Sequence, residues 1–159
     1  VEALLEAPAA AGVDLNARSE YGWTPLMRAE SCGNARVMAA LAAAGADVNA
    51  AGSGGETALH LATYNSDTDC VAVLLRAGAR PDMVGPKGDT PLHVAADVGS
   101  AEVVALLVAA GAVLGAVNHA GKTAEEVAAA RGHVGLAEAL RRRGSGRPAK
   151  GPALLQGSA

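Results

Sequence analysis

His60 and His93, together with Cys32 and Cys70, are the side chains whose types most suggest metal or thiol chemistry in this 159-residue chain. A metal site needs several ligands gathered around one ion. The two histidines instead follow two predicted helix starts 33 residues apart, so we interpret each as a hydrogen-bonding residue that ties its own turn together. We interpret Cys70 as a small core residue, and Cys32 as an exposed thiol with no neighbouring cation to activate it.

Two further patterns could indicate catalysis. The glycine-rich segment Gly52-Ser53-Gly54-Gly55 lacks the Lys-Ser/Thr pair of a nucleotide-binding loop. Glu125 and Glu126 are adjacent, and adjacent residues of a helix point to different sides, so they form a poor acid–base pair. We therefore predict no catalytic residue, no metal site and no cofactor, and a protein that is not an enzyme.

Composition and charge exclude other classes of protein. Residues 1–140 carry a net charge of −8 and residues 141–159 one of +5, which gives no case for nucleic-acid binding by the chain as a whole. The longest uncharged apolar run, 103–117, is shorter than the roughly 20 residues of a membrane helix, and no leader-like segment opens the chain. Two cysteines fit a reducing compartment. We expect an intracellular protein of the cytoplasm, the nucleus or both, without membrane insertion.

A repeat of 33 residues organises the chain. Alanines, leucines and glycines recur in the same register: Ala29, Ala62, Ala95 and Ala128; Leu41, Leu74, Leu107 and Leu140; Gly45, Gly78, Gly111 and Gly144. So does a short motif, present as Gly22-Trp23-Thr24-Pro25-Leu26, Gly55-Glu56-Thr57-Ala58-Leu59, Gly88-Asp89-Thr90-Pro91-Leu92 and Gly121-Lys122-Thr123-Ala124. Several columns in one register, without insertions, predict an array of identical structural units.

Each unit has the signals of two short helices. Threonine followed by proline is typical of an N-cap and the first helical position, and Thr123 with Glu126 forms a capping box. Apolar residues at helical spacing predict helices near 25–31 and 35–43 and at each 33-residue step beyond. The glycine after the second helix, ending with Gly144, supplies the left-handed residue that stops it. Helices this short need stacking to be stable.

The segments Thr90-Pro91-Leu92-His93-Val94-Ala95 and Gly45-Ala46-Asp47-Val48-Asn49-Ala50 resemble the signature of the ankyrin repeat. The resemblance implies an all-α fold, an ankyrin-repeat solenoid of stacked helix-turn-helix units joined by β-turn or hairpin loops. The units are a partial N-terminal unit at 1–18, repeats at 19–51, 52–84 and 85–117, a C-terminal capping repeat at 118–144, and a disordered basic tail at 145–159. Met27 and Glu126 stand where the family has histidine, and Ser66 stands for a glycine.

The two ends of the array differ. The first unit lacks its first helix, so its stacking face is expected to be open. Pro8 falls where a helical leucine is expected, which suggests a fragment of a longer chain or an altered N-terminal cap. At the other end Glu125 replaces an apolar residue and Arg141–Arg143 close the last helix, as a capping repeat requires. We expect a monomer, unless the open N-terminal face self-associates.

The resemblance implies a concave ridge, formed by the turn tips and the exposed side of the first helices, as the surface that binds another protein. Positions of this ridge that packing leaves free are the predicted partner-binding residues: Glu20, Tyr21, Trp23, Ser31, Cys32, Ser53, Glu56, Tyr64, Asn65, Lys87, Asp89, Asp97, His119, Lys122 and Arg131.

The three aromatic residues of the chain, Tyr21, Trp23 and Tyr64, all fall on these free positions. Tyrosine and tryptophan are enriched in interface hot spots, so we interpret them as anchors for a partner. In the alternative, Tyr21 and Trp23 only cover a turn. Acidic residues lie near the aromatics and basic ones near the far end, which favours a partner with a basic or apolar element at the first two units.

Other readings of the sequence remain open. The segment Arg142-Arg143-Gly144-Ser145 resembles a target of basophilic kinases, which makes Ser145 a possible phosphorylation site. The chain can be the ankyrin segment of a larger protein or enzyme whose activity lies elsewhere. It can also inhibit a cyclin-dependent kinase, because Tyr21-Gly22, Ala35–Val37 and Arg76–Arg80 resemble pieces of ankyrin-type inhibitors, although they mostly coincide with general repeat positions.

Overall fold

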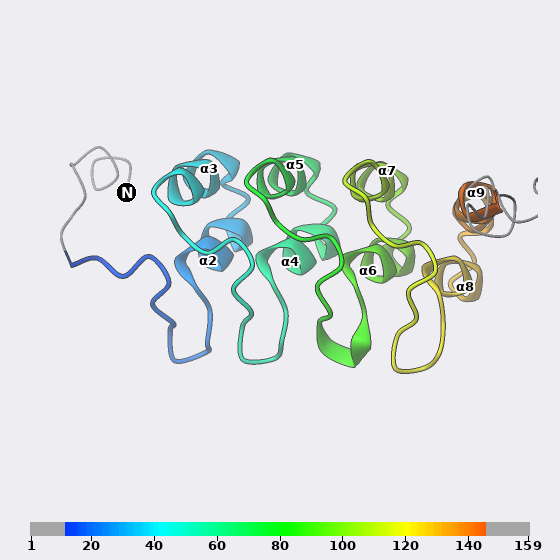
Figure 1. Cartoon of the computed structure of the whole chain (residues 1–159), viewed down its shortest axis with the longest axis horizontal. Helices are drawn as coiled ribbons and strands as arrows, with labels where there is room; N and C mark the ends of the chain where they lie inside the picture. Colours follow the sequence, from blue (N-terminus) through cyan, green and yellow to red (C-terminus); the bar gives the residue numbers. More distant parts are fainter. Residues whose placement is uncertain (1–11, 146–159) are drawn as a thin grey trace, which may run out of the picture.

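Helix pairs stack in a row in the computed structural model, which describes residues 12–145 (Figure 1). The start of the predicted N-terminal unit and residues 146–159 of the predicted tail lie outside the described residues. The first helices of the units are α2 (Pro25–Ser31), α4 (Ala58–Tyr64), α6 (Pro91–Val98) and α8 (Ala124–Ala130). The second helices are α3 (Ala35–Ala43), α5 (Thr68–Arg76), α7 (Ala101–Ala109) and α9 (Val134–Ser145). This arrangement confirms the predicted all-α solenoid.

The threonine of each motif starts a first helix, as predicted. Thr24, Thr57 and Thr123 accept a hydrogen bond from the backbone N–H three residues on, which satisfies one of the free donors at a helix start. In three units the residue at that third position completes a capping box: His60, His93 and Glu126. In the last unit the side chain of Glu126 therefore accepts the backbone N–H of the N-cap threonine, as the histidines do in the other two units.

The leucine and alanine columns form the core between the two rows of helices. Leu41, Leu74, Leu107 and Leu140 are all buried, as are the four alanines of the other column. The first helices contact one another along the row, α2 to α4, α4 to α6 and α6 to α8, and α3, α5 and α7 do the same. Because alanine lets helices approach closely, a core almost without aromatic residues can still be tightly packed.

Four loops project from the same side of the stack (Figure 1). We call them fingers one to four: residues 19–23, 52–56, 85–89 and 118–122. Each is a hairpin held by a backbone hydrogen bond across its base, such as Gly85 N–H to Asp89 C=O at 2.8 Å. Within residues 12–145 this pairing yields no strand, only an isolated bridge between Ala51 and Thr57. Finger three contains the 3₁₀ turn η1 (Pro86–Gly88).

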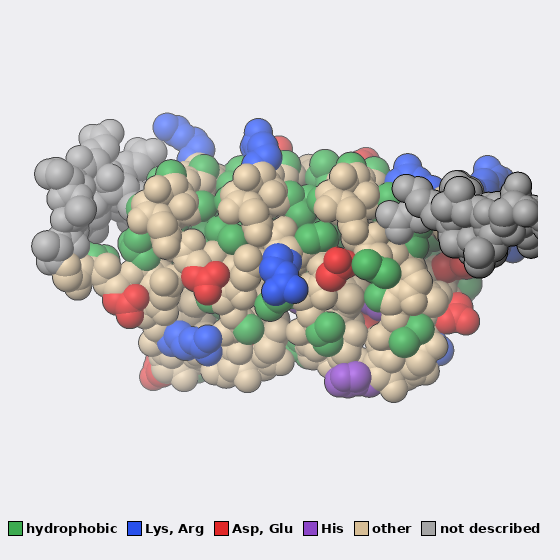
Figure 2. All heavy atoms as spheres, in the orientation of Figure 1, with side chains coloured by type: hydrophobic (Ala, Val, Ile, Leu, Met, Phe, Trp, Pro, Cys, Tyr) green, Lys and Arg blue, Asp and Glu red, His purple; other side chains and the backbone are tan. Residues whose placement is uncertain are grey.

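Side chains link each loop to the next. Asn16, Asn49 and Asp82, spaced by 33 residues, each accept a hydrogen bond from a backbone N–H of the following unit, at 2.8 to 3.0 Å. Gly115 holds this position in the next unit and ends the series. On the face shown in Figure 2, acidic and basic side chains alternate above the fingers and do not gather into a patch of one charge.

The prediction that a left-handed glycine stops every second helix is right for three units and wrong for the last. Gly45, Gly78 and Gly111 have positive φ angles, whereas Gly144 lies inside α9. The helix continues to Ser145, one residue into the predicted tail, whose hydroxyl donates to the Arg141 carbonyl at 2.9 Å.

Replacing Ser66 by glycine is expected to raise the free energy of unfolding by about 0.5–1 kcal/mol. Ser66 has a φ of 56° at a position where the other units have Gly33, Gly99 and Gly132, also at positive φ. The gain in stability comes from the relief of backbone strain in the left-handed conformation. It is reduced by the extra conformational entropy that glycine has in the unfolded chain. Urea denaturation measures it, with Ser100→Gly as the control, because Ser100 has a φ of −82°. A loss of stability in Ser66→Gly would contradict this assignment.

Candidate functional site

A hollow of about 310 Å³ lies on the concave ridge at the second, third and fourth units. We call it the central hollow. It begins at fingers two and three, follows the exposed sides of α4 and α6, and ends where these helices end. Its lining residues are Glu56, His60, Leu61, Tyr64, Pro86, Lys87, Asp89, Val94, Asp97 and Arg131.

The floor of the central hollow is apolar. Leu61 of α4 and Val94 of α6 are half-buried and occupy the same repeat position, one unit apart. In the first unit this position holds Arg28, which is exposed. The second and third units therefore give the hollow a hydrophobic surface at this position.

His60 also lines the central hollow and is only 4% exposed. Its Nδ1 accepts the backbone N–H of Thr57 at 3.2 Å, so the proton of the neutral ring sits on Nε2, which donates to the Asp89 carbonyl at 3.1 Å. Both nitrogens are thus engaged. His93 repeats the pattern with Thr90 and the Lys122 carbonyl. These bonds tie each unit to the next, and they leave neither histidine free to act as a catalytic base.

Lowering the pH is expected to destabilise the fold through His60. Burial lowers the pKa of this imidazole from its ordinary value of 6.5. The unfolded chain therefore takes up a proton before the folded chain does, and stability falls as the pH drops from 7 through about 6.5 toward the folded pKa. Urea denaturation at pH 7.5 and 5.5 should show a larger loss for the native chain than for His60→Ala. An equal loss in both proteins would rule out this role.

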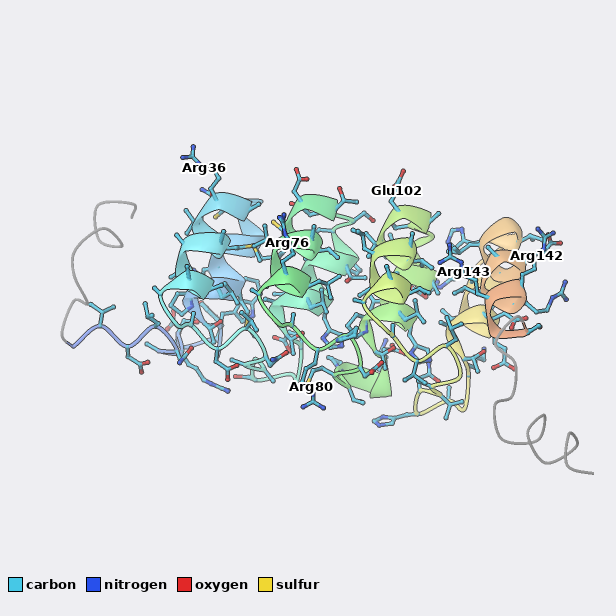
Figure 3. The ribbon with its side chains drawn as sticks, turned by 45° about the horizontal axis from the view of Figure 1, so that its top comes forward. Arg36, Arg76, Arg80, Glu102, Arg142 and Arg143 are labelled. Carbon is cyan, nitrogen blue, oxygen red and sulfur yellow. The ribbon has the colours of Figure 1, made fainter. Side chains whose placement is uncertain are left out.

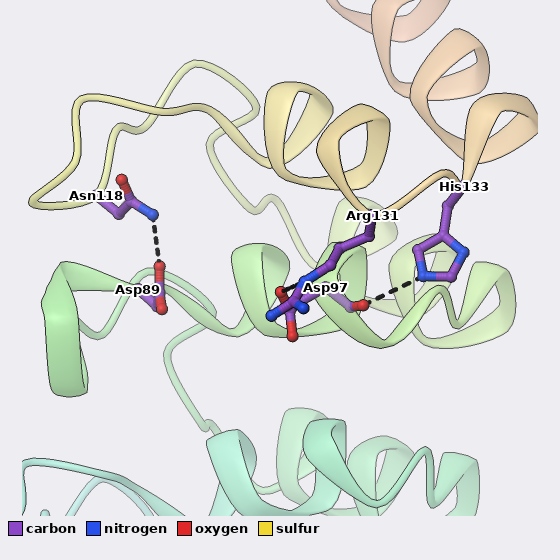
Figure 4. Close-up of polar contacts among 5 residues, drawn as sticks. All are labelled: Asp89, Asp97, Asn118, Arg131 and His133. Carbon is purple, nitrogen blue, oxygen red and sulfur yellow. Dashed lines mark hydrogen bonds and ion pairs between the residues drawn. The ribbon is translucent and has the colours of Figure 1, made fainter.

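Two carboxylates of the central hollow each accept a hydrogen bond from a side chain of the fourth unit (Figure 4). Asn118 Nδ2 donates to Asp89 Oδ1 at 2.8 Å, and Arg131 Nε donates to Asp97 Oδ1. His133 Nε2 donates to the Asp97 backbone carbonyl at 3.2 Å. These contacts join the third unit to the fourth. They fix the wall of the hollow, and the ion pair neutralises Asp97 and Arg131, whereas Asp89 keeps its charge and gains a hydrogen-bond donor.

Glu56 differs from the other two acids that line the hollow. Its side chain is half-buried, and its carboxylate makes no hydrogen bond or ion pair with residues 12–145. It lies close over finger two, where a Cβ added to Gly52 or Gly54 would be 2.5 or 2.6 Å from a carboxylate oxygen. The two glycines therefore make room for this side chain.

The aromatic residues divide into two kinds. Tyr21, in finger one, and Tyr64, at the end of α4, are each 68% exposed, and Tyr64 forms part of the central hollow. Trp23 is half-buried and packs against the core cluster. A covering role, which the sequence left open for both Tyr21 and Trp23, therefore applies at least in part to Trp23.

Six of the fifteen predicted partner-binding residues line the central hollow: Glu56, Tyr64, Lys87, Asp89, Asp97 and Arg131. The remaining nine lie outside it, along the fingers and helix ends: Glu20, Tyr21, Trp23, Ser31, Cys32, Ser53, Asn65, His119 and Lys122. Some of these have local partners. Ser31 Oγ donates to the Arg28 carbonyl at 2.9 Å, and the His119 backbone N–H donates to the Lys87 carbonyl at 3.0 Å.

Sequence reasoning missed Leu61 and Val94, and also the buried acid Glu30. Comparison with Arg28, at the same repeat position, is the signal that could have placed the two aliphatic residues on the surface.

Glu30 is 2% exposed, and Asn65 Nδ2 donates to its Oε1 at 2.9 Å. Burial raises the pKa of this carboxyl, and the Asn65 bond partly offsets the rise. No periodic signal marks Glu30, because the equivalent residues are Thr63, Ala96 and Ala129.

The cysteines lie where the sequence places them. Cys70 is fully buried and Cys32 is exposed. Burial and the nearby Asp67 raise the pKa of the Cys70 thiol to about 12, so this group is a poor nucleophile.

Among residues 12–145, no three His, Cys, Asp or Glu side chains are placed to hold a metal ion. No helix in this part of the chain is both long and apolar enough to cross a membrane.

Comparison with known protein families gives one match. The family model for ankyrin repeats, which comprises three copies of the repeat, matches residues 1–85 and 59–146. The two matches overlap and together extend over all the predicted repeat units. No curated protein matches the chain.

Proposed function

The chain belongs to the ankyrin-repeat family, whose members form protein–protein interaction modules and generally are not enzymes, and we propose that it binds a partner protein through its concave ridge. In this proposal Tyr21, Trp23 and Tyr64 are the aromatic anchors. The other predicted residues of the ridge surround them, and the protein acts without catalysis.

The observation that carries the proposal is the central hollow itself. It combines an apolar floor, a tyrosine that is 68% exposed and a half-buried carboxylate without a partner in the described residues. Interface hot spots share this composition, with an aromatic or charged side chain set in a surface that loses water on binding. The hollow is at the small end of the range of ligand pockets, which are roughly 300–1,000 Å³. Its size suits a few side chains of a protein.

Charge supports a protein and not a nucleic acid as the partner. Residues 1–140 carry a net charge of −8, which repels a phosphate backbone. The basic residues Lys87 and Arg131 of the central hollow do not change this, because Asp97 neutralises Arg131. A monomer, a location inside the cell and phosphorylation of Ser145 remain predictions from the sequence.

The kinase-inhibitor alternative gains no support from the arrangement of its residues. Arg36 and Arg76 belong to the row of second helices, and Arg36 points away from the stack (Figure 3). Tyr21 lies in finger one, below the row of first helices (Figure 1). The pieces that resemble such inhibitors therefore do not form one surface, whereas the residues of the central hollow do.

An affinity capture experiment tests the proposal. The native chain and the triple variant Tyr21→Ala, Trp23→Ala, Tyr64→Ala are used as baits in cell extract, and mass spectrometry identifies the captured proteins. A matched control replaces three exposed valines by alanine: Val113 and Val117 of the repeat at 85–117, and Val134 of the capping repeat. Circular dichroism and thermal unfolding first establish that all baits are folded. Because Trp23 packs against the core, the double variant Tyr21→Ala, Tyr64→Ala is tested beside the triple variant.

We expect a protein that the native chain and the valine control capture and that the aromatic variants lose. Capture that is unchanged in the folded aromatic variants would contradict the proposal and direct attention to the second helices and the tail.

A further inference from the structure

We propose that the central hollow recognises an extended segment of its partner that carries a lysine or arginine and, about four residues away, an apolar side chain. The basic group binds Glu56, and the apolar side chain covers Leu61, Val94 and the ring of Tyr64. This inference rests on the proposed function and specifies the chemistry of the partner.

The charges that remain free in the central hollow favour a cation. Of its three carboxylates, Asp89 is bound by Asn118 and Asp97 by Arg131, whereas Glu56 makes no bond within the described residues. A partner that covers the hollow removes water from Glu56. Without a cation the buried carboxylate would be left unpaired, which strongly disfavours binding. A lysine or arginine of the partner solves this problem with a charge-assisted hydrogen bond.

The cations of the hollow do not create an equal demand for an anion. Arg131 is already paired with Asp97. Lys87 is exposed at the tip of finger three, where its long side chain can keep its ammonium group in water while its stem is covered. His60, which also lines the hollow, is a neutral ring, since its Nδ1 accepts a hydrogen bond and carries no proton. It therefore does not compete for the carboxylate.

The spacing follows from the length of α4. Glu56 precedes the N-cap of α4 and Tyr64 is its last residue. A helix of seven residues is about 10 Å long, at 1.5 Å per residue, and Glu56 lies two residues before its first residue. An extended peptide advances about 3.3 Å per residue and its successive side chains point to opposite faces, so side chains on one face are an even number of residues apart. Four residues span about 13 Å. The basic side chain at Glu56 and the apolar one beside Tyr64 therefore come from positions about four apart.

The second unit is the place where these features coincide. The position of Glu56 holds Trp23, Asp89 and Lys122 in the other units, and the position of Tyr64 holds Ser31, Asp97 and Ala130. Asp89 is bound, and the other helix ends carry no aromatic ring. A partner segment thus has one register on the ridge, set by Glu56 and Tyr64.

Selection from a random peptide library displayed on phage tests the inference, followed by fluorescence anisotropy with labelled synthetic copies of the enriched peptides. The proteins are the native chain, Glu56→Gln, Glu56→Lys, Tyr64→Ala and the control Glu102→Gln, whose side chain points away from the stack on α7 (Figure 3). Thermal unfolding establishes that each variant is folded.

We expect enriched peptides with a lysine or arginine about four positions from an aliphatic or aromatic residue. Their affinity should fall about tenfold or more in Glu56→Gln and also in Tyr64→Ala, and stay unchanged in Glu102→Gln. Glu56→Lys should enrich acidic peptides instead. Peptides that need Tyr64 but bind Glu56→Gln equally well would overturn the inference and leave the proposed function standing. Failure to enrich any peptide that depends on Tyr64 would also overturn it, and the capture experiment would then decide the proposed function separately.

Discussion

Replacing Tyr64 by alanine is expected to weaken binding of the captured partner by about 30-fold or more, the effect of losing an aromatic hot spot. Tyr64 is 68% exposed and is the last residue of α4, with its ring at the edge of the central hollow. Because it makes little contact with the core, the variant should unfold at the same temperature as the native chain. Isothermal titration with the purified partner measures the affinity.

Two related variants sharpen this prediction. Tyr64→Phe keeps the ring and should retain most of the affinity, because the stacking surface is unchanged. Tyr21→Ala removes an equally exposed tyrosine that lies outside the hollow, and it should have a smaller effect. A loss in Tyr21→Ala as large as that in Tyr64→Ala would move the centre of the interface to finger one.

Replacing Gly88 by alanine is expected to lower the free energy of unfolding by about 3 kcal/mol, the range of strain combined with steric conflict in a packed site. Gly88 has a φ of 75°, and an added Cβ would lie 2.5 Å from the His119 ring and 2.7 Å from the His119 backbone nitrogen. The ring can turn away, but the backbone nitrogen cannot, because its N–H donates to the Lys87 carbonyl. Fingers three and four would have to separate.

Gly121 provides the matched control for this variant. It occupies the same repeat position with a φ of 71°, but an added Cβ would meet nothing within 4 Å. Gly121→Ala therefore carries only the backbone strain, about 1 kcal/mol. Urea denaturation of both variants separates the close approach of the fingers from the φ angle. Equal losses in the two would mean that the contact between fingers three and four contributes nothing.

The helices could be predicted from sequence because the repeat presents the same local rule several times. Threonine before proline or alanine starts each first helix, and a left-handed glycine follows the second helix in three units. Gly144 shows the limit of this rule. The residue type is the same, but Gly144 lies inside α9 and has no positive φ angle.

The surface was harder to predict than the core. Exposure of Tyr21 and Tyr64 could be read from their repeat positions, whereas Trp23, at an equally free position of the repeat, packs against the core cluster. The pairing of Asp97 with Arg131 joins residues 34 apart in different units. Sequence identified both as free positions, but only their geometry shows that they neutralise each other. That geometry leaves Glu56 as the unpaired acid of the hollow within residues 12–145.

Side-chain footprinting of the native chain with its captured partner tests the central claim most directly. Hydroxyl radicals label exposed side chains, and mass spectrometry compares labelling of each residue with and without the partner. We predict strong protection of Tyr64 and Leu61 and unchanged labelling of Val134, which is 62% exposed on α9. Unchanged labelling of Tyr64 in a saturated complex, with protection elsewhere, would contradict binding at the central hollow.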